Sequence, residues 1–95
     1  MIGETMNHDQ KFINLILDCE YIIKQNISHD FEDINRYNIL LNELRGLIET
    51  VKKKRLNNKL YYLSITQMID KSDPDEVITA VLKLNEFYCK YYQKL

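Results

Sequence analysis

Two stretches of this sequence carry apolar residues at alternating spacings of three and four, a pattern that restricts the chain to helical folds. The first seam consists of Ile34, Tyr37, Leu41, Leu44, Ile48 and Val51, and the second of Val77, Val81, Leu84, Tyr88, Tyr91 and Leu95. At this spacing, the apolar side chains of successive turns share one face of an α-helix. Both runs are too short to favour a free-standing coiled coil. We therefore expect long helices that pack against each other within one bundle.

Capping residues predict where the helices begin and end. Asn7, followed by Gln10, fits a capping box and predicts a helix that runs to about residues 25–26. Its buried face is expected to contain Phe12, Ile16, Cys19 and Ile23. Asp30 is the predicted N-cap of the second helix, which is expected to end at the cationic residues 52–55 because positive charge complements the dipole at a helix C-terminus. Gly46 inside this helix indicates either a closely approaching neighbouring helix or a bend.

Two more helices complete the predicted fold. A third is expected through residues 60–72, with Leu60, Leu63 and Met68 on its buried face. A fourth is expected to start with Asp73 as N-cap and Pro74 as the first helical residue. Four helices with short connections predict an all-α, antiparallel four-helix bundle. We expect one domain over residues 8–95, preceded by a flexible tail over residues 1–7.

Composition limits the classes of function. The chain has 95 residues with 13 basic and 14 acidic side chains, so it lacks the basic excess that is typical of nucleic-acid-binding proteins. Cys19 and Cys89 are far apart and form no metal-binding motif, which predicts reduced, buried thiols in a cytoplasmic protein. The N-terminal residues show no apolar signal segment, and no apolar run is long enough to span a membrane.

Catalytic and metal-binding constellations are not found in the sequence. His8 and His29 lie at the expected tail and first turn, and the paired carboxylates at 32/33 and 75/76 are explained by helix capping. There is no glycine-rich phosphate loop and no nucleophile motif. We expect a protein that is not an enzyme and that uses no cofactor, metal or small-molecule substrate.

Two local concentrations of side chains are candidates for a partner-binding surface. One is the basic run over residues 52–55, extended by Lys59. The alternative interpretation of this run is a solvated helix end. The other is aromatic: Tyr88 and Tyr91 lie on the seam and are expected in the core, so that Phe87 and Tyr92 are expected on another face. The predicted partner-binding residues are Lys52, Lys53, Lys54, Arg55, Tyr62, Phe87, Tyr91 and Tyr92. A protein partner is expected, and a homodimer is left open.

Residues 62–69 and 75–82 together resemble the helix-turn-helix of winged, MarR-like regulators. This resemblance implies a DNA-binding transcriptional regulator. Asp73, Asp75 and Glu76, however, place acid at the start of the recognition helix, where phosphate groups would lie, and no residues remain for a wing. Nucleic acid is therefore the less favoured partner, and a regulatory inhibitor encoded by a phage or plasmid is a further alternative.

Residues 37–40 and 56–63, with Thr66 and Lys71, resemble the second and third helices of the class IIa (pediocin-like) bacteriocin immunity proteins, the enterocin A immunity family. The resemblance implies a cytoplasmic four-helix bundle that protects a low-GC Gram-positive producer cell. It also implies action at the inner face of the membrane, on a mannose phosphotransferase permease complexed with the bacteriocin. The longer C-terminal tail of that family is missing or very short here. Bacteriocin self-immunity is the most specific function that the sequence suggests.

Overall fold

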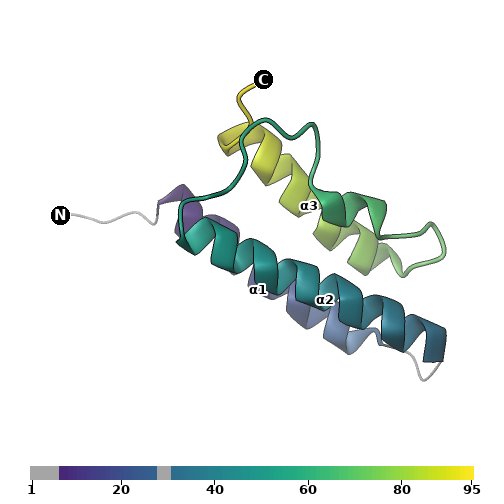
Figure 1. Ribbon diagram of the computed structural model, residues 1–95. Coiled ribbons are helices and arrows are strands. Elements are labelled where there is room, and N and C mark those ends of the chain that lie inside the picture. The colour runs from purple at the N-terminus through teal and green to yellow at the C-terminus, as the bar shows by residue number, and fades with distance from the viewer. Residues whose placement is uncertain (1–6, 28–30) are drawn as a thin grey trace.

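The computed structural model describes residues 7–27 and 31–95, and within these residues all regular secondary structure is helical. These residues form three α-helices, α1 (His8–Gln25), α2 (Phe31–Lys52) and α3 (Asp75–Tyr91), and one 3₁₀ helix, η1 (Ser64–Gln67), between α2 and α3. The all-α prediction is thereby confirmed, as Figure 1 shows. Of the tail expected over residues 1–7, only Asn7 belongs to the described residues, and the expected Asp30 cap also lies outside them.

The first helix forms as its sequence predicts. The side-chain oxygen of Asn7 accepts a hydrogen bond from the backbone N–H of Gln10 at 2.8 Å and so caps the helix start. The Gln10 side chain donates to Asn14 at 3.1 Å. The predicted apolar stripe is buried throughout and consists of Phe12, Ile16, Cys19 and Ile23.

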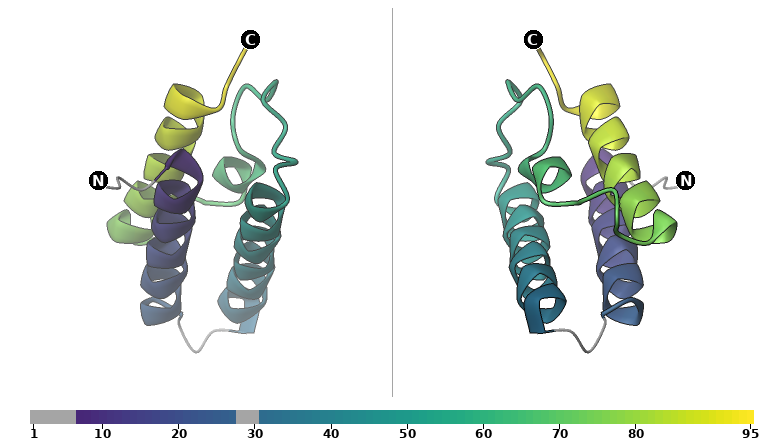
Figure 2. Two further views of the ribbon diagram at one scale, coloured as in Figure 1. Left: turned by 90° about the vertical axis from the view of Figure 1, so that its left-hand side faces the viewer. Right: turned by 90° about the vertical axis from the view of Figure 1, so that its right-hand side faces the viewer.

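α1 lies at the centre of the arrangement. It runs antiparallel to α2, and α3 packs across it on another side (Figures 1 and 2). η1 contacts both α2 and α3. The helices α2 and α3 are therefore connected through α1 and through η1. The core between these elements contains Tyr37, Leu40, Leu44, Ile48 and Val51 from α2 and Val77, Val81, Leu84 and Tyr88 from α3, together with the stripe of α1.

The helix expected through residues 60–72 is not formed, and the four-helix bundle is therefore not confirmed. This part of the chain is irregular apart from η1. Leu63 and Ile65 are both buried. On an α-helix, residues two positions apart are related by a rotation of about 200° around the axis and so lie on nearly opposite faces. Thr66 uses its hydroxyl to bond the carbonyl of Leu63 at 2.8 Å, which supports a tight turn. The burial of two residues in alternate positions is incompatible with one continuous α-helix, although the apolar residues of this segment have a weak helical spacing.

Asp73 does not cap α3 as predicted. The helix is preceded by Pro74, whose carbonyl accepts hydrogen bonds from the N–H groups of Val77 and Ile78. The side chain of Asp73 is directed inward, where it pairs with Arg36 of α2, and the residue is 6% exposed. Asp73, a residue type that often caps helices, instead makes a long-range contact with Arg36, which the local sequence does not predict.

Two further expectations about helix faces are corrected by the structure. Among the described residues, nothing beyond the adjoining residues and backbone of α2 itself lies within 4 Å of a Cβ placed on Gly46, so close approach of a neighbouring helix does not explain this glycine. The second apolar seam ends earlier than predicted, because α3 stops at Tyr91 and leaves Leu95 68% exposed.

Candidate functional site

The basic run lies at the C-terminal end of α2, as predicted. The backbone N–H of Lys54 donates to the carbonyl of Val51, and that of Arg55 donates to Thr50, which is the hydrogen-bond pattern of a Schellman cap. Lys54 has a φ of 58°, the left-handed conformation that glycine usually supplies at this position. The cap turns the chain sharply and leaves four consecutive cationic side chains exposed: Lys52, Lys53, Lys54 and Arg55. We call these four residues and Lys59 the basic end.

Asp9 of α1 connects the basic end to α3. Its carboxylate forms an ion pair with Lys54 and accepts a hydrogen bond from the Tyr92 hydroxyl at 2.6 Å. The hydrogen bond from Lys54, followed by that from Tyr92, lowers the pKa of Asp9 below its usual value. The pKa of the Tyr92 phenol is raised, first by burial and then by the neighbouring carboxylate. One acidic side chain thus joins the start of α1 to the ends of α2 and α3.

The sequence does not correctly predict which aromatic side chains at the end of α3 are buried and which are exposed. Tyr88 is fully buried as expected, but Tyr91 is 37% exposed because it lies at the last turn of the helix. Phe87 and Tyr92 are half-buried and pack against Phe12, with ring centroids 5.4 Å and 5.2 Å from it. The expectation that Phe87 and Tyr92 lie away from the core is wrong.

Tyr91 forms the outer part of this aromatic cluster. Its ring centroid lies 4.5 Å from that of Phe87 and 4.2 Å from that of His8, at the start of α1. Lys90 places its ammonium group 5.2 Å from the centroid of the same ring. Among the phenylalanine and tyrosine rings of the cluster, Tyr91 is therefore the one with the most surface open to a partner.

The irregular segment over residues 57–63, which turns at residues 58–59 and bends at residues 61–62, is held by side chains of α3 and the residues after it. The backbone N–H of Leu60 donates to the Tyr88 hydroxyl at 3.1 Å, and that hydroxyl donates to the carbonyl of Asn57. Asn85 accepts from the N–H of Leu63 at 2.8 Å. Gln93 donates from its amide to the carbonyl of Leu60 at 2.8 Å. Side chains of the last helix thereby satisfy backbone groups that a helix would have satisfied internally.

This anchoring presents two tyrosines to solvent. Tyr61 is 77% exposed and Tyr62 is 50% exposed, although both belong to an ordered segment. Lys59 lies on the same segment and donates from its ammonium group to the carbonyl of Lys94 at 3.0 Å.

The predicted site residues gather at one end of the molecule, with one exception. The ends of α2 and α3 and the start of α1 lie together there, as Figure 2 shows, and Asp9, Lys54 and Tyr92 connect them. Tyr62 lies farther along the irregular segment, next to the residue that Asn85 holds. The positive charge and exposed aromatic surface of this end suit an acidic partner with apolar side chains.

Among the side chains described over residues 7–27 and 34–95, no three of His, Cys, Asp or Glu cluster as a metal site would require. Cys19 and Cys89 are free thiols, and burial raises the pKa of Cys19 to about 12, which makes it a poor nucleophile at neutral pH.

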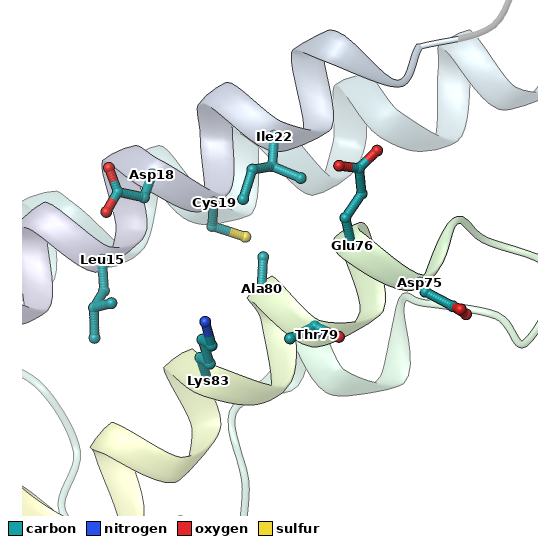
Figure 3. Close-up of a pocket in the computed structure, with 9 residues that line it drawn as sticks. All are labelled: Leu15, Asp18, Cys19, Ile22, Asp75, Glu76, Thr79, Ala80 and Lys83. Atoms are coloured by element: carbon teal, nitrogen blue, oxygen red, sulfur yellow. The ribbon is translucent and has the colours of Figure 1, made fainter.

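A second surface feature, which the sequence did not indicate, is a groove between α1 and α3. It has a volume of about 470 Å³ and is drawn in Figure 3. It is lined by Leu15, Asp18, Cys19, Ile22, Asp75, Glu76, Thr79, Ala80 and Lys83. Sequence reasoning also missed the roles of Asp9, Asn85 and Gln93, because their partners lie 22 to 83 positions away along the chain.

None of the helices over the described residues is long and apolar enough to cross a membrane. Comparison of the chain with models of known protein families, with curated proteins and with solved structures found no match.

Proposed function

We propose that this protein acts by binding another protein through the basic end and through Tyr61 and Tyr62, the exposed tyrosines of the irregular segment that follows α2. The observation that carries the proposal is the anchored segment over residues 57–63. It presents Lys59, Tyr61 and Tyr62 on a backbone that α3 holds in place. A pre-ordered surface loses less conformational entropy on binding than a loose loop would lose.

The side chains of this surface are of the kinds that dominate protein interfaces. Tyrosine and arginine are enriched among the residues that contribute most to binding. Within the basic end, Lys54 is paired with Asp9, whereas Lys52, Lys53 and Arg55 have no acidic partner among the described residues. These three cations are available to steer an acidic partner and to pair with it.

The most specific form of the proposal is self-immunity to a bacteriocin. It rests on the resemblance of residues 37–40 and 56–63 to the pediocin-like immunity proteins, and the all-helical chain with antiparallel α1 and α2 is consistent with it. In this form the protein is cytoplasmic and non-enzymatic. It binds a mannose phosphotransferase permease complexed with bacteriocin at the inner face of the membrane. The irregular segment in place of a third helix is a departure from that family's fold.

The DNA-binding regulator remains the alternative, with less support. The segment that resembles the first helix of a helix-turn-helix contains only the four-residue η1, and Asp75 and Glu76 are exposed at the start of α3. These carboxylates would repel phosphate groups at the position where a recognition helix approaches DNA.

Expression in a sensitive low-GC Gram-positive host tests the immunity proposal. The wild-type chain should raise resistance to one or a few pediocin-like bacteriocins. Lys53→Glu and Tyr62→Ala should each abolish most of that protection, while circular dichroism shows the fold intact. Lys71→Glu changes the net charge as Lys53→Glu does, but in the turn before α3, and should protect like wild type. Equal killing of expressing and control cells across the panel contradicts the immunity proposal.

A fluorescence-polarisation titration against genomic DNA fragments distinguishes the DNA-binding regulator from the protein-binding proposal. We expect no sequence-selective binding at physiological salt. Submicromolar selective binding that disappears when residues 52–55 are changed to glutamine would instead favour the regulator. Such binding should also weaken steeply with salt, with a log–log slope of about −0.9 per phosphate neutralised.

A further inference from the structure

The groove between α1 and α3 has an apolar floor and open sides. Cys19 and Ala80 face each other across it and are both buried, and their small side chains leave the hollow between the helices (Figure 3). Leu15 and Ile22 are half-buried and border the hollow on the side of α1. Apolar surface at this place therefore remains in contact with water in the free protein.

The length of the groove corresponds to two helical turns. Its lining residues extend over seven positions on α1, from Leu15 to Ile22, and over eight positions on α3, from Asp75 to Lys83. Seven residues of α-helix span about 10 Å. A docked helix would present side chains at positions i, i+3 or i+4, and i+7 over the same length, which is the usual arrangement for helix-in-groove binding.

Charge at the rim is predominantly negative. Asp18 lies on the α1 side, Asp75 and Glu76 lie on the α3 side, and Lys83 is the single cation among the lining residues. Among the residues that the structure describes, none of these four takes part in an ion pair. All four are exposed, so their charges are open to a partner.

The groove continues along α3 as a shallower hollow of about 320 Å³ with the opposite charge balance. Lys83 and Lys90 accompany the single acid Glu86 there, beside Phe87 and Tyr91. A partner lying along α3 would therefore meet acid near the start of the helix and base near its end.

We propose that the α1–α3 groove binds an amphipathic helix of a partner protein whose apolar stripe is flanked by lysine or arginine. The apolar side chains of the partner fill the hollow over Cys19 and Ala80. Its basic residues pair with Asp18, Asp75 and Glu76. The charge balance along α3 fixes the direction of the docked helix, with its basic half over the start of α3. This surface is distinct from the basic end.

A phage-displayed peptide library tests this proposal with the full chain as target. The library presents an 18-residue helix with randomised stripe and flanking positions. It is selected on the wild-type chain and counter-selected on Ala80→Phe, whose ring fills the groove. We expect enrichment of large aliphatic or aromatic residues in the stripe and of lysine or arginine beside it. The consensus peptide should bind Ala80→Phe at least about tenfold more weakly than wild type.

Two further sets of variants locate the binding site. Asp75→Lys combined with Glu76→Lys should weaken the basic consensus peptide by at least about tenfold and should favour a matched peptide with glutamate flanks. Leu82→Ala, at an exposed residue of α3 that does not line the groove, should leave binding unchanged. Lys53→Glu at the basic end should also leave it unchanged, so that failure of the groove and failure of the proposed function are distinguishable. Thr79→Trp at the rim replaces Ala80→Phe if circular dichroism shows that the latter does not fold.

Three outcomes overturn the proposal. The first is a selection that yields no peptide sensitive to filling of the groove. The second is a consensus with acidic or uncharged flanks. The third is a wild-type chain that forms dimers in light scattering while Ala80→Phe is monomeric, because a second copy would then occupy the groove.

Discussion

Arg36 and Asp73 form a two-pronged ion pair that joins α2 to the turn before α3. The guanidinium nitrogens Nη1 and Nη2 lie 2.9 Å and 2.5 Å from the two carboxylate oxygens. The Tyr37 hydroxyl and the backbone N–H of Asp70 donate to the same carboxylate at 2.9 Å and 2.8 Å. The side chain of Asp73 is 2% exposed, so this carboxylate is held by protein donors in place of bulk water.

The pH dependence of stability should reveal this ion pair. The hydrogen bond from Arg36 is the main cause that lowers the pKa of Asp73 from 3.8 to about 2. A carboxyl whose pKa is lowered by folding stabilises the protein fully above its unfolded value, and that contribution is lost as the pH falls through the folded value. We expect a loss of about 2 kcal/mol in the free energy of unfolding between pH 5 and pH 2 from this group.

Asp73→Asn isolates that contribution. The variant should be about 2 kcal/mol less stable than wild type at pH 6 and nearly equal to it at pH 2, as measured by urea denaturation. Asp75→Asn, an exposed neighbour, is the matched control and should change stability little. A difference between wild type and Asp73→Asn that does not vary with pH contradicts the role given to the ion pair.

The Tyr88 hydroxyl should be essential for order in the irregular segment. Tyr88→Phe keeps the buried ring but leaves the N–H of Leu60 and the carbonyl of Asn57 without this partner. We expect a loss of about 2 kcal/mol in stability, with faster amide hydrogen exchange at Leu60. Tyr61→Phe removes a hydroxyl from a residue that is 77% exposed and should have no such effect. Unchanged exchange at Leu60 in Tyr88→Phe would show that the Tyr88 hydroxyl is not needed to hold the segment.

Lys54 combines an unfavourable backbone conformation with a favourable ion pair. Substitution by alanine removes the pair with Asp9 and retains the positive φ of 58°. Substitution by glycine removes the pair and also relieves the backbone strain. We therefore expect Lys54→Gly to be about 1 kcal/mol more stable than Lys54→Ala in thermal or chemical unfolding. Equal stabilities would mean that the Schellman cap does not persist in solution.

Gly46 is a site where stability can be gained. It lies inside α2, and no group of the described residues beyond its own helix lies within 4 Å of the position that an alanine methyl would take, so alanine fits without displacement. Gly46→Ala should raise the free energy of unfolding by about 0.5–1 kcal/mol through its greater helix propensity. The denaturant m-value should stay constant. A decrease in stability would indicate that α2 bends at this residue.

Helix positions were largely predictable because they depend on local signals. The Asn7 cap, the stripe of α1 and the cationic end of α2 all occur where the spacing and capping residues predict them. These features need only residues within one or two turns, which a single sequence displays directly.

The remaining features depend on contacts between distant residues. Asp73 has the sequence signature of an N-cap, yet it pairs with Arg36, 37 positions away. Tyr91 continues a seam by spacing but is exposed because the helix ends there, whereas Phe87 is covered by Phe12 from the start of the chain. The groove between α1 and α3 likewise depends on which helix faces meet, and helical spacing leaves that choice open.

The anchoring of residues 57–63 by α3 also determines the order of folding. The groups that complete the backbone hydrogen bonds of this segment belong to Asn85, Tyr88 and Gln93, which follow it by 22 to 33 positions. The α1–α2 hairpin has a short connection between its helices and can form early, because short loops close at low entropic cost. These hydrogen bonds can form only after α3 has packed beside the segment. During synthesis, the surface that carries Tyr61 and Tyr62 is thus completed only after Gln93 has left the ribosome.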